Sequence, residues 1–257
     1  NPTKNYGSGG DFTLNGGGLV GARGASEFIS RSMYNNASYL INNSINSLND
    51  SSTLTAMCAF RFHGVSTTFY FSLNTGSQIV AEVQASYDSN SVTIKCRDTL
   101  GTQSVNTVAT GCSFVGSAIW HTALISVNMA DKKVRVIVDG SIIATTNAVN
   151  TNDIGFSNVS RATVNADATL VCYGKNSSSS CYFTTDYIDF SSEANRNLFV
   201  NQLGYPRDLT PDIEAGSIPT PLIYLPFDDI ANLGKNMGSG GDFSVVGSVT
   251  SGSDFTL

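Results

Sequence analysis

Charged residues are scarce in this sequence. They make up 13% of its 257 residues, and 14 lysines and arginines against 20 aspartates and glutamates give a formal net charge of −6. Affinity for nucleic acid depends largely on lysines and arginines that neutralise phosphates, so this balance argues against a nucleic-acid partner. Glycine, serine, threonine and asparagine are abundant instead, which is typical of a β-rich, turn-rich protein of the extracellular type.

Metal-ligand patterns and long apolar runs are also lacking. Two histidines, His63 and His121, and five cysteines without a CxxC pair do not match the spacing of a structural zinc site. No apolar run approaches the roughly 18 residues that cross a bilayer, and no signal-peptide pattern is present, so we expect no membrane insertion. Because the first residue is Asn1 and not Met, we expect a processed form or a part of a longer protein.

The cysteines leave several pairings open. Cys172 and Cys181 flank a turn and can face each other across a hairpin, while Cys96 and Cys112 bracket another loop. Cys58 lies in an apolar segment, where a buried thiol behaves as a small hydrophobic side chain. The odd count leaves at least one free thiol.

The stretch at residues 120–146, WHTALISVNMADKKVRVIVDGSIIATT, is the centre of the predicted fold. It contains three apolar runs rich in Val, Ile and Thr, separated by a polar turn at 130–133 and by Asp139-Gly140. An Asp-Gly pair supplies the positive φ angles of a tight hairpin. We therefore predict a strand, a turn, a second strand and a hairpin return, at the centre of an antiparallel sheet.

Short apolar segments between Asn, Asp, Ser and Gly clusters predict further strands, at residues 37–41, 53–62, 68–73, 79–87, 91–97, 104–109, 168–174, 182–190 and 222–227. Such spacing is typical of a β-sandwich or barrel. One short helix is expected near residues 192–203, capped by Ser191 or Ser192 and ended by Gly204. The prolines of residues 205–220 predict an extended surface loop.

A repeat joins the two ends of the sequence. Residues 4–16 read KNYGSGGDFTLNG, residues 235–247 read KNMGSGGDFSVVG, and residues 251–257 echo them as SGSDFTL. These are either two similar glycine loops of one fold or assembly contacts. We favour assembly, because repeated segments are typical of linked copies and unpaired edge strands are templates for a partner chain. The predicted assembly residues are Asn5, Gly7, Asp11, Phe12, Asn236, Gly238, Asp242 and Phe243.

Two stretches resemble a known family. At residues 120–146, a Trp-His opening, an alternating strand, a polar turn and a strand ending in Val-Asp-Gly resemble the central hairpin of laminin G-like and pentraxin-like domains, members of the concanavalin A-like lectin/glucanase group. Residues 187–249 resemble the closing segment of laminin G-like jelly-roll domains frequent in tailed-phage virion proteins. The matching parts are a helix with Asn-Leu-Phe before Gly and Pro, a Gly-Ser-x-Pro-x-Pro loop at 216–221, and Asn-x-Gly-Ser-Gly-Gly-x-Phe at 236–243.

The resemblance implies an all-β fold, a concanavalin A-like jelly-roll β-sandwich of two antiparallel sheets with the one short helix. We divide the chain into a Gly-rich opening segment with an edge strand at 1–34, a laminin G-like β-sandwich at 35–227, and a Gly-rich C-terminal segment at 228–257 that repeats the N-terminal motif. Such segments usually close a domain, whereas here a copy also opens the chain.

Catalytic patterns are lacking, and we expect no enzyme activity. Glucanases of this group carry acidic residues that alternate on one strand, and no Glu-x-Asp-x-Glu pattern occurs. Asp186 and Asp189 have an odd spacing, which places them on opposite faces of a strand. No Gly-x-Ser-x-Gly elbow accompanies His121, which we interpret as a structural histidine.

Binding residues are predicted in loops. Calcium, which relatives in this group often bind through Asp and Asn oxygens, has candidate ligands that are also ordinary turn residues: Asp131, Asp228, Asp229, Asn152 and Asp153. A glycan site needs an aromatic platform beside amides or carboxylates. The candidates, whose tyrosines can equally be packing residues, are Tyr87, Asp88, Asn90, Tyr173 and Tyr182.

The resemblance implies a non-enzymatic virion structural protein, such as a fibre, tail or capsid decoration protein. We expect it on the virion surface or in another extracellular setting. It would assemble through its terminal strands, with copies of itself or with other virion proteins, and contact host-surface glycans. The alternative is a cellular carbohydrate-binding lectin or adhesin domain.

Overall fold

The computed structural model describes residues 33–35, 39–45, 48–62, 68–114, 119–164, 176–227, 230–247 and 249–251. Several predictions fall outside these residues: the strand at 168–174 and the candidates Asn5, Gly7, Asp11, Phe12, His63, Cys172, Tyr173, Asp228 and Asp229.

The described residues form two antiparallel sheets. The first has eight strands, in the order β10 (Ser141–Asn147), β9 (Lys133–Val138), β8 (Trp120–Asn128), β3 (Thr53–Phe62), β12 (Asn176–Thr184), β1 (Met33–Asn35) and β15 (Val249–Ser251), with β13 (Ile223–Leu225) also paired to β12. The second has seven described strands, in the order β14 (Ser244–Val246), β2 (Tyr39–Asn42), β11 (Arg161–Val164), β4 (Thr68–Asn74), β5 (Ile79–Ser86), β6 (Ser91–Arg97) and β7 (Gln103–Thr110). The C-terminal segment therefore contributes a strand to each sheet.

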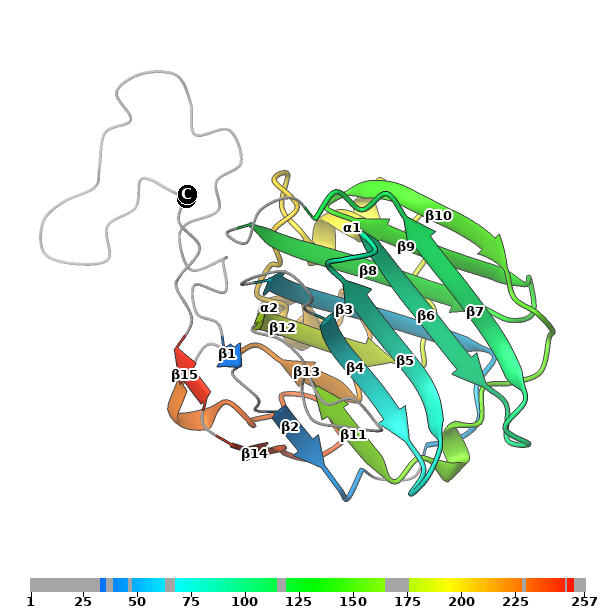
Figure 1. The fold of residues 1–257 in the computed structure, drawn as a ribbon, viewed down its shortest axis with the longest axis horizontal. Helices are drawn as coiled ribbons and strands as arrows, with labels where there is room; N and C mark the ends of the chain where they lie inside the picture. The colour runs from blue at the N-terminus through cyan, green and yellow to red at the C-terminus, as the bar shows by residue number, and fades with distance from the viewer. Residues whose placement is uncertain are drawn as a thin grey trace, which may run out of the picture.

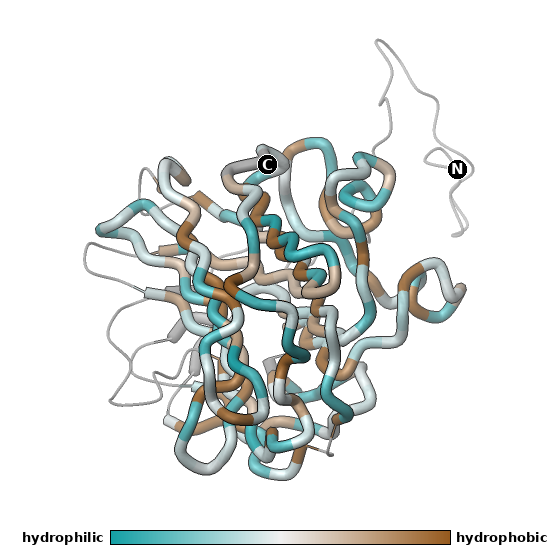
Figure 2. The backbone as a smooth tube through the Cα atoms, turned by 90° about the vertical axis from the view of Figure 1, so that its right-hand side faces the viewer, coloured by the Kyte–Doolittle hydropathy of each residue, from teal (hydrophilic) through white to brown (hydrophobic). Residues whose placement is uncertain are grey.

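The main hydrophobic core fills the space between the two sheets, which lie face to face in Figure 1. Phe60 on β3 stacks against Phe69 on β4 with ring centroids 5.2 Å apart, and Phe71 on β4 lies 5.9 Å from Phe183 on β12. Burying one such ring contributes roughly 1.5–3 kcal/mol, so these contacts hold the sandwich closed. Figure 2 shows apolar and polar stretches interspersed along the described backbone.

A second apolar cluster lies on the outer face of the first sheet. Met57 on β3, Leu124 on β8 and Tyr182 on β12 meet Phe190 and Phe199 there. Phe199 ends α1 (Glu193–Phe199), which lies behind this sheet in Figure 1 together with α2 (Thr210–Glu214). The first sheet is therefore buried on both faces, which explains why nearly every residue of β8 is buried.

The predicted meander is confirmed. Strands β8, β9 and β10 follow one another along the chain and pair as antiparallel neighbours. The β9–β10 turn has φ angles of 49° at Asp139 and 77° at Gly140, as an Asp-Gly hairpin turn requires. The two-sheet jelly-roll sandwich is confirmed as well.

The segments around the helices differ from the prediction. Helix α1 is capped by Ser192 as expected, but it ends at Phe199 because Val200 is extended and forms an isolated bridge with Pro206. The loop predicted at 205–220 contains α2, with Pro211 in its first turn. Two single-turn 3-10 helices, η2 (Phe156–Asn158) and η3 (Ile230–Asn232), complete the described helices, none of which is long and apolar enough to cross a membrane.

Strands β12 and β11 are among those that differ from the sequence prediction. The strand predicted at 182–190 begins earlier, because β12 starts at Asn176 and ends at Thr184. Strand β11 is not predicted by the sequence, because four residues are too few to show an alternating pattern.

The four cysteines within the described residues are buried free thiols, so Cys96 and Cys112 do not pair. Burial raises the pKa of Cys112 to about 11. Cys58 on β3 lies opposite Cys181 on β12, and burial followed by the neighbouring Cys181 raises the pKa of the Cys58 thiol.

Candidate functional site

Three of the predicted glycan residues meet at the turn between β5 and β6. Asp88 and Asn90 are exposed there, whereas Tyr87 is half-buried with its ring centroid 5.7 Å from that of Phe62. The Asn90 side chain has a structural partner, because its Oδ1 accepts a hydrogen bond from the backbone N–H of Phe114 at 3.0 Å. Packing accounts for the position of Tyr87 and a hydrogen bond for that of Asn90, and a glycan role for this cluster stays a prediction.

Tyr182 does not join that cluster, and its prediction as a glycan platform is wrong. It is 1% exposed, its ring packs edge-on against Phe199 at 5.1 Å, and its hydroxyl donates to the carbonyl of Pro219 at 2.9 Å. Burial, followed by the charge of Asp186, raises its pKa. The physical reason is that Tyr182 points to the outer face of the first sheet, which the α1 and α2 layer covers.

The metal candidates within the described residues are scattered. Asp131 is exposed in the β8–β9 turn, where its carboxylate accepts from the side-chain amide of Asn128 at 3.0 Å. The amide of Asn152 donates instead to Asp98, at 2.8 Å. Among the described residues, no group of three or more His, Cys, Asp or Glu side chains is placed to hold a metal ion.

The C-terminal assembly candidates lie on the sandwich itself, in residues 235–247, which we call the closing strap. The Asn236 side chain accepts from the backbone N–H of Tyr224 at 2.8 Å and donates to the carbonyl of Leu222 at 3.0 Å. Asp242 accepts from the backbone N–H of Asn236 at 3.0 Å, and Phe243 joins the main core.

Backbone contacts complete the seating of the closing strap. A Cβ atom on Gly238 would lie 2.6 Å from the carbonyl oxygen of Leu222, so only glycine permits this approach. On the other sheet, the side-chain amide of Asn42 on β2 donates to the carbonyls of Gly240 and Gly241 at 2.9 and 3.0 Å. The closing strap therefore joins the two sheets before β14 pairs with β2.

A polar pocket that sequence reasoning missed lies between the β9–β10 turn and α1. Its volume is about 310 Å³, and it is lined by Asp139, Gly140, Glu193, Arg196, Asn197, Val200, Asn201, Gln202 and Gly204. This volume is at the lower end of the roughly 300–1,000 Å³ typical of small-ligand sites. Carboxylates, amides and one guanidinium dominate the lining, and none of these lining residues is aromatic.

The start of β8 fixes the carboxylate of Asp139 at one wall. Its Oδ2 lies 2.7 Å from Nδ1 of His121, and its Oδ1 accepts from the backbone N–H of Thr122 at 2.8 Å. His121 is buried, with its ring 4.8 Å from that of Phe114, which agrees with a structural role. Gly204, in the turn after α1, lies directly against Asp139. A Cβ atom on Gly204 would lie 3.2 Å from Cα of Asp139, so glycine permits this close approach of the two turns.

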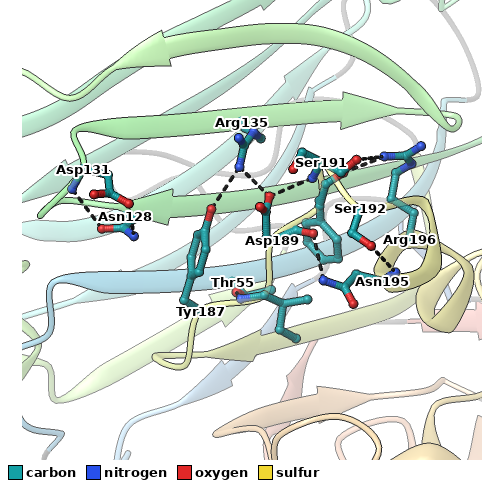
Figure 3. A network of polar contacts seen from close by, with 12 residues as sticks. Thr55, Asn128, Asp131, Arg135, Tyr187, Asp189, Ser191, Ser192, Asn195 and Arg196 are labelled. Atoms are coloured by element: carbon teal, nitrogen blue, oxygen red, sulfur yellow. Dashed lines mark hydrogen bonds and ion pairs between the residues drawn. The ribbon is translucent and has the colours of Figure 1, made fainter.

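A polar network that includes one ion pair holds the segment leading into α1, as Figure 3 shows. Arg135 on β9 donates to the carboxylate of Asp189 at 2.5 Å and to the hydroxyl of Tyr187 at 3.0 Å. Partial burial raises the pKa of Asp189, but hydrogen bonds from Ser191 and the charges of Arg135 and Lys133 outweigh it and lower the pKa overall. This network holds the segment before α1 against the first sheet.

Helix α1 begins from that anchored segment. The side chain of Asn195 donates to the carbonyl of Asp189 at 2.9 Å, and Arg196 donates to the carbonyls of Phe190 and Ser191 at 2.8 and 3.0 Å. Arg196 is thereby fixed along the pocket, while Glu193 and Asn197 on the same helix are exposed. The pocket combines fixed groups with accessible ones.

The lining suits a ligand rich in hydroxyl groups. Amides donate and accept hydrogen bonds, and carboxylates accept them strongly. Two carboxylates and one guanidinium line the pocket, so the lining offers no excess of positive charge to an anionic ligand. No local pattern marks this site in the sequence, because Asp139 reads as a turn residue and meets α1 only through the fold.

Comparison with known proteins supports the fold. No family model and no curated protein matches the sequence. Among solved structures, the chain is similar to a native heptameric SAP-like pentraxin from Limulus polyphemus, with a TM-score of 0.54, 12% identity, and coverage of 88% of this chain and 97% of the pentraxin. Because the identity is low, this likeness shows the jelly-roll sandwich and nothing of function.

Two further solved structures overlap less well. One is the LG4-5 domain pair of the mouse laminin alpha1 chain, with a TM-score of 0.45, 11% identity, and coverage of 66% of this chain and 46% of that one. The other is the CBM40 of the Ruminococcus gnavus IT-sialidase bound to α2,3-sialyllactose, with a TM-score of 0.44, 12% identity, and coverage of 58% and 93%. TM-scores this low carry no argument about this chain.

Proposed function

We propose that this chain is a non-enzymatic, carbohydrate-binding sandwich domain of an extracellular assembly, such as a virion fibre, tail or decoration protein. It contacts neutral, hydroxyl-rich glycans on a host surface through the pocket between α1 and the β9–β10 turn. The observation that carries the proposal is a polar pocket on a jelly-roll sandwich, in which His121 holds the lining residue Asp139 and Arg135 holds the segment that leads into α1.

The pocket predicts weak binding by a single copy. Without an aromatic platform, affinity rests on hydrogen bonds, each of which contributes about 0.5–1.5 kcal/mol net and more to a charged group. Attachment then requires many copies, since linked sites convert weak single contacts into strong overall binding. This requirement fits an assembled structural protein better than an isolated domain.

The test is a screen of neutral and anionic glycans by ligand-observed NMR at millimolar sugar, followed by pocket variants. We expect neutral glycans to bind, and Glu193→Gln combined with Asn197→Ala to weaken binding by about tenfold. Glu214→Gln is the matched control, because Glu214 is an exposed glutamate of α2 outside the pocket. Binding of anionic glycans alone, or binding unaffected by the pocket changes, contradicts the proposal.

The alternative, a cellular lectin or adhesin domain, uses the same fold and differs in assembly. Light scattering of the full chain at increasing concentration separates the two. A monomer at all concentrations that binds sugar with calcium dependence favours the cellular lectin, whereas a defined oligomer favours the structural assembly.

A further inference from the structure

The sequence of the closing strap recurs at the other end of the chain, and the structure shows which contacts the closing strap makes. Residues 4–16 and 235–247 are identical at nine of 13 positions. In the closing strap these nine positions are Lys235, Asn236, Gly238, Ser239, Gly240, Gly241, Asp242, Phe243 and Gly247.

Each identical position has a contact or a backbone requirement. The contacts of four of these positions are described above: Asn236, Gly238, Gly240 and Phe243. Lys235 pairs with Asp242 at 3.2 Å. The backbone N–H of Ser239 donates to the carbonyl of Pro221 at 3.0 Å. Gly241 and Gly247 have φ angles of 83° and 86°, which favour glycine.

Each of the four differing positions is exposed. Met237, Val245 and Val246 are 46%, 43% and 37% exposed, and Ser244 is exposed as well. In the N-terminal copy these positions hold Tyr6, Leu14, Asn15 and Thr13. The two copies therefore agree at the buried positions of the closing strap, Asn236, Gly240 and Phe243, and differ only at positions whose side chains are exposed.

A flexible linker does not explain this agreement. Flexibility requires glycine and serine, but it does not require a lysine, an asparagine, an aspartate and a phenylalanine in the same register. We define the strap site as Asn42, Pro221, Leu222, Tyr224 and the β2 edge that pairs with β14. The Asn236 side chain bonds to this site and Phe243 packs into the main core, while Asp242 accepts hydrogen bonds from Lys235 and from the backbone of Asn236 and so fixes the turn of the strap itself.

We propose that residues 4–16 are a second, interchangeable strap that docks on the strap site of another copy of this chain after that copy's own strap has left it. Both straps offer the same contacts, so exchange changes little in contact free energy. Against a strap from another copy, the resident strap prevails at low protein concentration because its tether gives it a high effective concentration. Donor and strap site lie on different parts of the chain, so exchange links copies head to tail.

The test uses the full chain with both straps weakened by Asn5→Ala, Phe12→Ala, Asn236→Ala and Phe243→Ala. Fluorescein-labelled peptides of residues 4–16 and 235–247 are titrated against it, with anisotropy as the readout. We expect dissociation constants within about threefold of each other. The 4–16 peptide with Asn5→Ala and Phe12→Ala should bind at least about tenfold more weakly, and its Tyr6→Met control should bind as the parent does.

Two results overturn the inference. One is binding of the 235–247 peptide without binding of the 4–16 peptide, and the other is binding of neither to the folded host. If the chain with both straps weakened is unfolded without peptide, the readout is whether adding a peptide restores a cooperative unfolding transition. The same peptides are compared, and the same two results overturn the inference.

This inference deepens the assembly part of the proposed function and does not use the glycan pocket. If the chain binds neutral glycans but does not bind the 4–16 strap, only the strap inference is contradicted. If it binds the 4–16 strap but no glycan, the strap inference stands and the proposed carbohydrate role is contradicted.

Discussion

At the scale of single side chains, buried hydroxyls of the first sheet differ in whether they have partners. The Thr55 hydroxyl on β3 donates to the carbonyl of Asp186 at 2.8 Å and accepts from the backbone N–H of Ile188 at 2.9 Å. The Ser180 hydroxyl on β12 is fully buried, with no hydrogen-bond partner in the described part of the chain. The two hydroxyls should therefore affect stability in opposite directions.

We predict that Ser180→Ala leaves the free energy of unfolding unchanged or raises it by about 1 kcal/mol, because an unpaired buried polar group is removed. Thr55→Val should lower it by about 1–3 kcal/mol, because the backbone N–H of Ile188 loses its acceptor. Urea unfolding of both variants beside the parent checks this pair. A stabilised Thr55→Val or a clearly destabilised Ser180→Ala would contradict the assignment of partners.

Asp98 is a residue whose charge state should matter for stability. A hydrogen bond from Asn152 lowers its pKa; partial burial opposes this, and the backbone N–H groups of Thr102 and Leu100 lower the pKa further. Because the folded-state pKa lies below the ordinary value, its contribution is full above about pH 4 and is lost as pH falls through the folded-state pKa.

We therefore predict that Asp98→Asn reduces the loss of stability on acidification from pH 6 to pH 3. Asn152→Ala, which removes the strongest favourable partner of the carboxylate, should reduce it as well. Urea unfolding at the two pH values gives the comparison. An acid sensitivity as steep as that of the parent in both variants would show that Asp98 is not responsible.

At the scale of elements, the closing strap depends on close backbone contact. A Cβ atom added to Gly238 would meet backbone atoms at 2.6 Å, whereas one added to Gly76, in the turn between β4 and β5, would meet nothing within 4 Å. The same substitution should therefore have different effects at the two sites.

Gly238→Ala should lower the free energy of unfolding by about 1–3 kcal/mol, the cost of forcing extra volume into a packed site. Gly76→Ala should change it by no more than about 0.5 kcal/mol, as surface substitutions do. Thermal unfolding with both variants tests the seating of the closing strap. Equal effects of the two substitutions would mean that the strap is held more loosely than these contacts require.

At the scale of the whole molecule, sheet position decides which parts open first. Strand β3 pairs with β8 on one side and β12 on the other and is buried on both faces, while all three residues of β14 are exposed at an edge. Local opening is easiest where few buried contacts must be broken.

We predict that amide hydrogen exchange is slowest in β3 and β8 and fastest, among the strands, in β14. Mass spectrometry of exchanged peptides resolves the two regions in one experiment. Protection of β14 as strong as that of β3 would show that the closing strap opens only with the whole sandwich, and strap exchange would then require global unfolding.

Local patterns predicted much of this molecule and failed where tertiary contacts decide. Alternating apolar segments and the Asp139-Gly140 turn revealed most strands, because strand period and turn chemistry are local properties of the sequence. Tyr182 was misplaced because a strand residue on a covered outer face looks the same as one facing solvent. The pocket was missed because its walls, at Asp139 and Glu193, meet only in the folded chain.

The pairing of β1 with β15 has a mechanical consequence. Met33 and Ser251 lie directly opposite each other at one end of this antiparallel pair, while Asn35 and Val249 lie opposite at the other. Tension applied outward through residues 33 and 251 therefore loads one residue pair at a time and peels the strands apart, instead of shearing all their hydrogen bonds together. Peeling would continue from β15 into the closing strap, so a chain pulled by its ends would bare its strap site before the sandwich core yields.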